Sequence, residues 1–202
     1  RRERHLLARL AHPNIAALRD AGVAADGRPY VVLDFVDGDP IDRHCAARRL
    51  DVRARVALLL DVCAAVAHAH RLLVVHRDIK PANVLVTADG TPTLLDFGVA
   101  RVLAPTADDA AEPVPPTRPG EQPYTPEYAS PEVLRGEPAT TAADVYALGV
   151  LLYELLTGVR PHAVGALPPA EAAAAIAGAP PPRPSDAIAA RVGAPGLPGD
   201  PE

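Results

Sequence analysis

The sequence is poor in sulfur-containing and aromatic residues. Among its 202 residues there are two cysteines, no methionine and no tryptophan, and aromatic residues make up 3%. The cysteines, Cys45 and Cys63, are too few for a disulfide framework or, without other ligands, a zinc site, and they suit a reducing compartment. The core must therefore be built from leucine, valine, isoleucine and alanine.

Long hydrophobic runs and a signal peptide are also missing. No run of about 18 uncharged apolar residues is present, so the sequence predicts no membrane-spanning segment. The first residues, Arg1-Arg2-Glu3-Arg4, are not those of a signal peptide. We expect a cytoplasmic piece of a longer chain, and a membrane tether beyond Glu202 stays open.

The charge balance argues against one class of partner. Lys and Arg number 20 and Asp and Glu 25, a net charge of −5, which disfavours nucleic-acid binding as the main function. With 49% hydrophobic and 22% charged residues, the composition is that of a globular chain with one domain or slightly more.

Hydrophobic spacing predicts the secondary structure of the first half. We expect a helix over 3–10, strands around 15–20 and 29–35 joined by the turn signal Asp26-Gly27, and a connector over 37–40. A long, mostly buried helix is predicted over 53–70, and short strands over 72–75, 84–86 and 93–95.

The second half alternates between helical and proline-rich sequence. A helix is predicted from Thr141 to Gly158, where the glycine suits a helix end. Residues 99–123 are expected to form a long loop, and 163–202 a linker with a short helix over 171–177. The prolines of 113–119 suit either such a loop or a docking sequence for a proline-binding module.

One cluster of polar residues has a chemical meaning. The octet His76-Arg77-Asp78-Ile79-Lys80-Pro81-Ala82-Asn83 lies between two predicted strands, and Asp96-Phe97-Gly98 follows one strand later. Phosphoryl transfer from ATP needs a carboxylate near the acceptor hydroxyl, oxygen ligands for a metal and a cation near the phosphates. Both motifs match the catalytic loop and metal motif of protein kinases.

On these motifs the chain resembles bacterial, eukaryotic-like serine/threonine protein kinases from Glu3 to about His162. Lys80 is typical of serine/threonine kinases, and 125–132 resembles the substrate-docking loop, with Ser130 where the family usually has alanine. The resemblance implies an α+β, protein-kinase-like fold with a mostly helical C-lobe. Its expected parts are an N-lobe remnant over 1–36, a C-lobe over 37–165 and an Ala/Pro-rich tail over 166–202.

The resemblance also implies roles for individual residues, with ATP and Mg²⁺ as cofactors. Asp78 would orient and deprotonate the acceptor hydroxyl, Lys80 would neutralise charge on the transferred phosphoryl, and Thr125 would bond both and select Ser or Thr acceptors. Asn83 and Asp96 would hold the metal. The implied nucleotide contacts are Glu3, Leu33 as gatekeeper, Asp34, Val36, Lys80, Leu85 and Asp96; the implied structural residues are His76, Phe97, Gly98, Glu132 and Asp144.

Some residues allow two interpretations. Asp144 could form a capping box with Thr141, and the resemblance implies that its carboxylate bonds the backbone of His76 and Arg77; both can be true. His68 and His70 lie two apart on a helix, so they face different directions and predict no metal site.

The resemblance also suggests a regulatory step. Arg77, next to the proposed base, would need an anion beside it, and phosphorylation of Thr106 or Thr117 could supply one. Activity is then expected to rise on phosphorylation of the loop.

Parts of the family pattern are not seen. The glycine-rich loop and the strand lysine that would pair with Glu3 should precede Arg1, so we expect this chain alone to bind ATP weakly. The arginine partner of Glu132 is not recognisable, since Arg160, Arg183 and Arg191 lie outside its motif.

Three functions remain in competition. The first is a fragment of a kinase acting on protein Ser/Thr hydroxyls, with dimerisation for autophosphorylation. The alternatives are a truncated, non-catalytic relative that serves as a binding or scaffold module, and a small-molecule kinase of similar fold. Residues 125–132 favour the protein kinase over the small-molecule enzyme.

Overall fold

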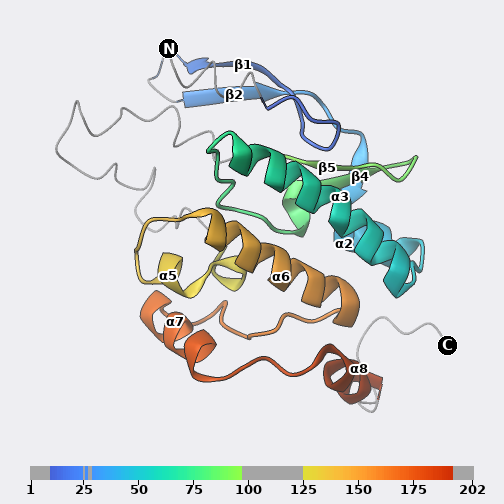
Figure 1. The fold of residues 1–202 in the computed structure, drawn as a ribbon, viewed down its shortest axis with the longest axis vertical. Coiled ribbons are helices and arrows are strands. Elements are labelled where there is room, and N and C mark those ends of the chain that lie inside the picture. The colour runs from blue at the N-terminus through green and yellow to red at the C-terminus, as the bar shows by residue number, and fades with distance from the viewer. Residues whose placement is uncertain (1–9, 25, 27–28, 97–124, 193–202) are drawn as a thin grey trace.

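The computed structural model describes residues 10–24, 26, 29–96 and 125–192. Figure 1 shows β-strands at one end, two long helices side by side in the middle and shorter helices at the other end. This mixture of helices and small sheets agrees with the predicted α+β class. The helix predicted over 3–10 falls almost wholly outside the described residues.

The first sheet is a two-stranded antiparallel pair. Strand β1 (Leu18–Val23) pairs with β2 (Pro29–Leu33), which confirms the two predicted strands. β1 begins later than predicted because Ile15 bridges Leu94 in the second sheet instead, and the Ala16 amide donates to the Leu94 carbonyl at 3.0 Å. The segment before β1 thus ties the two sheets together.

The second sheet has three antiparallel strands in the order β3 (Gly38–Pro40), β4 (Val84–Thr87), β5 (Pro92–Leu94). The last two confirm the strands predicted there. The connector predicted over 37–40 was wrong, because its last three residues pair with β4. Glycine is needed at position 38, where a Cβ would lie 2.7 Å from the Val86 carbonyl oxygen.

The strand predicted over 72–75 was also wrong. The Leu72 and Val74 amides both donate to the Ala69 carbonyl, at 2.9 and 3.0 Å, so the chain folds back on the preceding helix and does not join a sheet. Hydrophobic residues alone could not distinguish these two outcomes.

Two helices form the centre of the molecule. Helix α3 (Val52–Arg71) is capped at its N-terminus by Asp51, whose side chain accepts from the Ala54 amide at 2.8 Å. Helix α6 (Thr141–Thr157) is followed by Gly158, which has φ 73°. Both confirm predicted helices. α3 is less buried than expected, because only one of its faces enters the core (Leu58, Leu59, Val62, Ala65, Val66, Ala69).

Four shorter elements complete the helical part. They are α2 (Ile41–Ala47), which was not predicted, the 3-10 turn η2 (Pro126–Tyr128), α5 (Pro131–Leu134) and α7 (Pro169–Gly178), which contains the helix predicted over 171–177. α5 and α7 share a small apolar cluster formed by Ala129, Leu134, Val164, Ala172 and Ala173.

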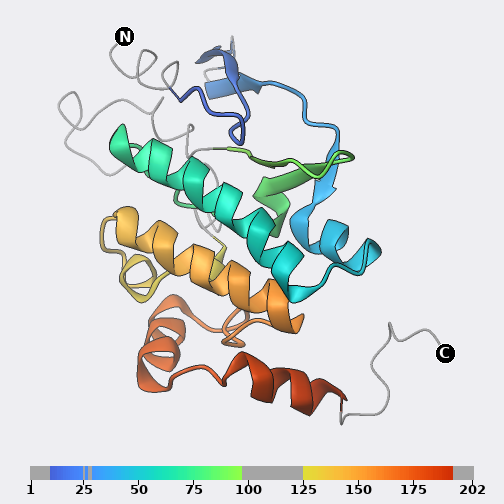
Figure 2. The same ribbon diagram turned by 45° about the vertical axis from the view of Figure 1, so that its right-hand side comes forward.

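The predicted linker contains a further helix. Helix α8 (Pro184–Val192) packs along α6, as Figure 2 also shows. Its Arg191 guanidinium donates to the Thr157 carbonyl at 3.2 Å, at the end of α6. This contact joins residues far apart in the sequence, so composition alone could not predict it.

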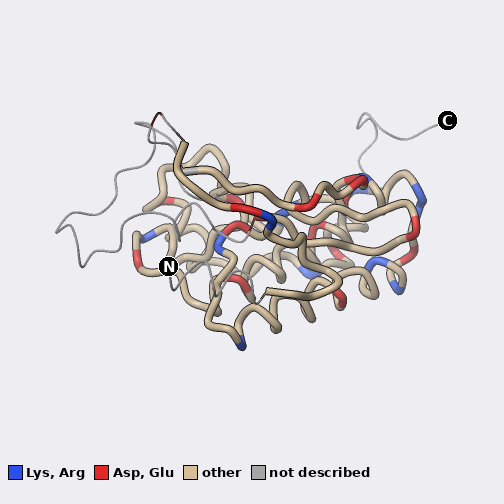
Figure 3. Tube along the Cα trace, turned by 90° about the horizontal axis from the view of Figure 1, so that it is seen from above, with Lys and Arg blue, Asp and Glu red and all other residues tan. Residues whose placement is uncertain are grey.

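Acidic and basic residues are interspersed along the described chain and are not gathered by sign (Figure 3). Within the described ranges, no helix is both long and apolar enough to span a bilayer.

The packing of α6 allows a stability test. Leu151 is fully buried, so Leu151→Ala should lower the free energy of unfolding by about 2–5 kcal/mol through lost burial and a residual cavity. Val145→Ala on the same helix, where the side chain is 62% exposed, should change it by less than about 0.5 kcal/mol. Urea unfolding measures both, and equal effects would contradict this core.

Candidate active site

The polar octet forms a loop between the end of α3 and β4. It begins at the buried His76 and ends in the 3-10 turn η1 (Pro81–Asn83). Arg77 has φ 75° and Asp96 has φ 50°, left-handed values that cost energy in residues other than glycine. Other contacts must therefore hold the backbone in this shape.

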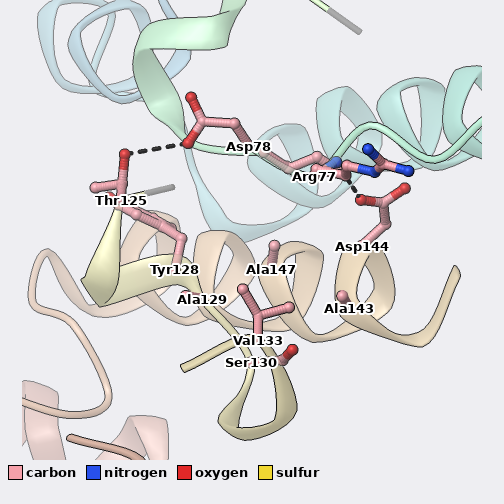
Figure 4. A pocket seen from close by; sticks show the side chains of 11 residues that line it. Arg77, Asp78, Thr125, Tyr128, Ala129, Ser130, Val133, Ala143, Asp144 and Ala147 are labelled. Carbon is pink, nitrogen blue, oxygen red and sulfur yellow. Dashed lines mark hydrogen bonds between the residues drawn. The ribbon is translucent and has the colours of Figure 1, made fainter. Parts of the chain in front are cut away.

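Asp144 of α6 supplies the first of these contacts. Its carboxylate, 1% exposed, accepts hydrogen bonds from the backbone amides of His76 and Arg77, each at 2.8 Å. Figure 4 shows Asp144 beneath the loop, beside Arg77. The capping-box alternative is wrong, because the residue that caps α6 is Thr140, whose hydroxyl accepts from the Ala142 amide at 3.3 Å.

Sequence reasoning missed a third partner of this carboxylate. His70, in the last turn of α3, places Nε2 at 2.7 Å from Asp144 Oδ2. From the sequence, this histidine raised only the question of a metal site, which its spacing from His68 argues against. The contact depends on how α3 packs against α6, and no local spacing in the sequence indicates it.

His76 connects the loop to the neighbouring strand. Its Nε2 donates to the Leu95 carbonyl at 2.7 Å, and its Nδ1 accepts from the Asp78 amide at 3.3 Å. These bonds require a neutral ring with the proton on Nε2. Burial lowers the pKa of His76, while the bond to Leu95 opposes that shift, so the neutral form is favoured.

Asp78, Lys80 and Thr125 lie together at the outer side of the loop. Lys80 Nζ is 2.7 Å from Asp78 Oδ2 and donates to Thr125 Oγ1 at 2.8 Å. Thr125 Oγ1 in turn donates to Asp78 Oδ1 at 3.1 Å (Figure 4). The Asp78 side chain is 29% exposed, so an acceptor hydroxyl could reach its carboxylate.

Asn83 is oriented by the same aspartate. Its Nδ2 donates to the Asp78 carbonyl at 2.7 Å and to Asp78 Oδ2 at 3.1 Å. The amide nitrogen is thereby committed, and the amide oxygen stays available as a metal ligand.

Asn83 and Asp96 carry donors that fit Mg²⁺. Asp96 is exposed and makes no hydrogen bond or ion pair with the other residues that the structure describes. Mg²⁺ prefers oxygen and commonly binds one or two carboxylates together with substrate phosphates and water. Among the described residues no group of three or more His, Cys, Asp or Glu could hold a metal, so phosphate and water oxygens would complete this shell.

The residues expected to contact the adenine end of the nucleotide lie on two elements. Leu33 is its last residue, and Val36 follows in the connection to β3, while Leu85 lies in β4. The Asp34 amide donates to the Ala17 carbonyl at 2.9 Å, which leaves the carbonyl of Asp34 as its backbone group for a ligand. Glu3, Phe97, Gly98, Thr106 and Thr117 lie outside the described residues.

The region after Thr125 is tied down by an arginine. Arg160 Nη1 is 2.9 Å from Glu127 Oε1, and its guanidinium lies 5.4 Å from the centre of the Tyr128 ring. No ion pair of Glu132 is found with residues of the described ranges. Ser130, in the pocket of Figure 4, is buried, and its hydroxyl has no partner there, so the alanine usual in the family would fit.

The role of Asp144 leads to a test. In Asp144→Asn an NH₂ group replaces one acceptor oxygen and faces a backbone amide, which should cost about 2–4 kcal/mol of unfolding free energy. The His76 and Arg77 amides should also lose protection from hydrogen exchange. Asp42→Asn, at an exposed position of α2, should change neither quantity, and unchanged protection in Asp144→Asn would refute the role.

Comparisons with known proteins agree with this geometry. The family model described as protein kinase domain matches residues 1–168. The chain is 36% identical over 170 residues to serine/threonine-protein kinase PknB of Mycolicibacterium smegmatis, covering 80% of this chain and 25% of that protein. It is 42% identical over 168 residues to serine/threonine-protein kinase PkaA of Streptomyces coelicolor, covering 81% and 29%.

These relatives are much longer than the chain, which spans about a quarter of their length. The family match, however, extends over most of the chain and includes both the loop of Asp78 and the segment of Thr125. The chain therefore belongs to the protein kinase domain family.

Proposed function

We propose that this chain is part of a serine/threonine protein kinase that transfers the γ-phosphate of ATP to protein hydroxyls. The observation that carries the proposal is the triangle of Asp78, Lys80 and Thr125, in which a carboxylate, a cation and a hydroxyl lie within 2.7–3.1 Å of one another. Relatives that share these segments are named serine/threonine-protein kinases.

Each member of the triangle has a chemical task. The Asp78 carboxylate accepts the proton of the acceptor hydroxyl and aligns its oxygen with the phosphoryl group. The Lys80 ammonium, held against that carboxylate, lies where it neutralises charge that develops on the transferred group. Thr125 fixes the direction of both side chains and presents a methyl group beside the acceptor.

The nucleotide end of the site is supplied by other residues. The Asn83 amide oxygen and the Asp96 carboxylate would hold Mg²⁺, which would offset the charge of the phosphates. Leu33, Asp34, Val36 and Leu85 would contact the adenine end. The regulatory roles of Arg77, Thr106 and Thr117 remain predictions.

The non-catalytic alternative is less well supported. A binding module has no physical need for the left-handed backbone at Arg77 and Asp96 or for the buried charge of Asp144, each of which costs free energy. All three features make sense if the loop has to hold reacting groups in place.

The proposed base gives the first test of this function. In the full-length gene product, Asp78→Asn should lower the rate of peptide phosphorylation by about 10²–10⁴-fold, because the amide cannot accept the proton. Nucleotide affinity, measured by calorimetry, should change little. Asp37→Asn, at an exposed aspartate of the connection between sheets, is the control, and a parent protein that phosphorylates no Ser/Thr peptide would refute the proposal.

Thr125 gives a second test. Thr125→Val keeps the shape of the side chain but removes the hydroxyl that joins Asp78 to Lys80, so phosphorylation of a Ser peptide should fall by about tenfold. Thr125→Ser restores the hydroxyl and should recover most of the rate. Initial rates at saturating ATP distinguish these outcomes, and equal rates in the Val variant and the parent would contradict the role.

A further inference from the structure

A histidine turn precedes the first strand. The Asn14 amide donates to Nδ1 of His12 at 3.1 Å. A nitrogen that accepts from an N–H carries no proton, so His12 is neutral here and its proton lies on Nε2. Uptake of a second proton at Nδ1 would remove this hydrogen bond and weaken the turn, which the Ile15 amide also closes by donating to the His12 carbonyl at 3.0 Å.

A second histidine lies against the first. The rings of His12 and His68 have centroids 5.3 Å apart and are tilted by 39°. His68 projects from α3, and its Nε2 is buried without a hydrogen-bond partner among the described residues. A proton added to His12 would place a cation beside the His68 ring in a partly buried contact.

The surroundings of His12 lower its pKa on balance. Burial lowers the pKa of His12, and His68 and Arg71 of α3 lower it further, while Asp61 of α3 opposes them. His12 in the closed turn therefore takes up a proton less readily than His12 in an unfolded chain.

Three hydrogen bonds, here called the grip, hold strand β5 against the segment from Asn14 to Ala16. Asn14 Nδ2 donates to the Pro92 carbonyl at 2.7 Å, and the Leu94 amide donates to the Asn14 carbonyl at 2.8 Å. The Ala16 amide completes the grip through the Leu94 carbonyl at 3.0 Å. These three bonds connect residues about 80 positions apart in sequence.

β5 leads directly into the site. Leu95 follows the strand, and its carbonyl accepts from His76 Nε2, while Asp96 is the next residue and has a left-handed backbone. A strand that is held less firmly would leave Asp96 less well placed, because its strained conformation depends on these contacts.

We propose that His12 and His68 form an acid-sensitive joint that sets how firmly β5, and with it Asp96, is held. The joint stands on the described contacts alone, whereas its consequence for metal binding rests on the proposed function. Both histidines act through the strand and are positioning residues.

The direction of the effect follows from linkage. A loosened turn binds a proton at His12 more readily than the closed turn does. The grip is therefore complete at pH values above 6.5, the ordinary pKa of histidine, and it weakens as the pH falls below that value. Acidification should loosen β5 before it unfolds the core.

Hydrogen exchange of single amides tests the joint without any assay of activity. In the 202-residue chain, the Leu94 and Ala16 amides report on the grip, and the amide of Leu151 in the core reports on global unfolding. After correction for intrinsic exchange, protection of the first two should fall by roughly threefold or more from pH 7.5 to 5.5, relative to the third.

Three variants locate the effect. His12→Asn keeps a side-chain acceptor for the amide two residues on but cannot titrate, and His68→Phe keeps a ring without the orphaned nitrogen. His12→Asn should abolish most of the pH dependence at Leu94, and His68→Phe should reduce it, because burial, the larger cause of the low pKa of His12, remains. His162→Asn is the control, since burial also lowers the pKa of His162 but it lies on neither α3 nor the turn.

The outcomes are distinct. Equal pH dependence at Leu94 and Leu151 in the parent, or a pH dependence at Leu94 that persists in His12→Asn, would overturn the joint. Calorimetric titration of the full-length gene product with Mg²⁺ and ATP forms a separate arm. Absence of binding at either pH would count against the proposed function, whereas the exchange result would still decide the joint.

Discussion

The site depends on one buried charge. Asp144 is held by the core packing of α6, and its carboxylate is removed from water, a cost that is offset by hydrogen bonds from two backbone amides and the contact with His70. Because both oxygens are engaged, the loop has one favoured position relative to the helix. The unusual backbone of Arg77 is then a consequence of where α6 lies.

Further hydrogen bonds connect the loop held by Asp144 to the neighbouring strand. His76 couples the loop to the strand end through Leu95, and the strand is held in turn by the segment around Asn14. Asp78 and Asp96 thus lie on two different segments that share supports. Rigid elements supply the position, while Asp78 and Asp96 themselves lie on loops.

The sequence predicted best what is local. The octet and the segment 125–132 could be matched to the kinase family from their residues, and α3 and α6 could be predicted from their apolar spacing. Residues 38–40 form a strand where a connector was predicted, and residues 72–75 form none where a strand was predicted. Strand pairing depends on a partner that is distant in sequence, so a short stretch of sequence cannot predict it. His70 and α8 were missed for a related reason: each acts through a contact with α6 that follows only from the packed structure.

The close approach at Gly38 bears on mutational tolerance. Phe35 is 90% exposed in the same short connection, so its side chain is free to vary without steric conflict. Three residues later there is no room for even a methyl group against β4. Sequence drift in functional versions of this chain should therefore be uneven here, with wide variation at one position and glycine alone accepted at the other, even though neither residue takes part in chemistry.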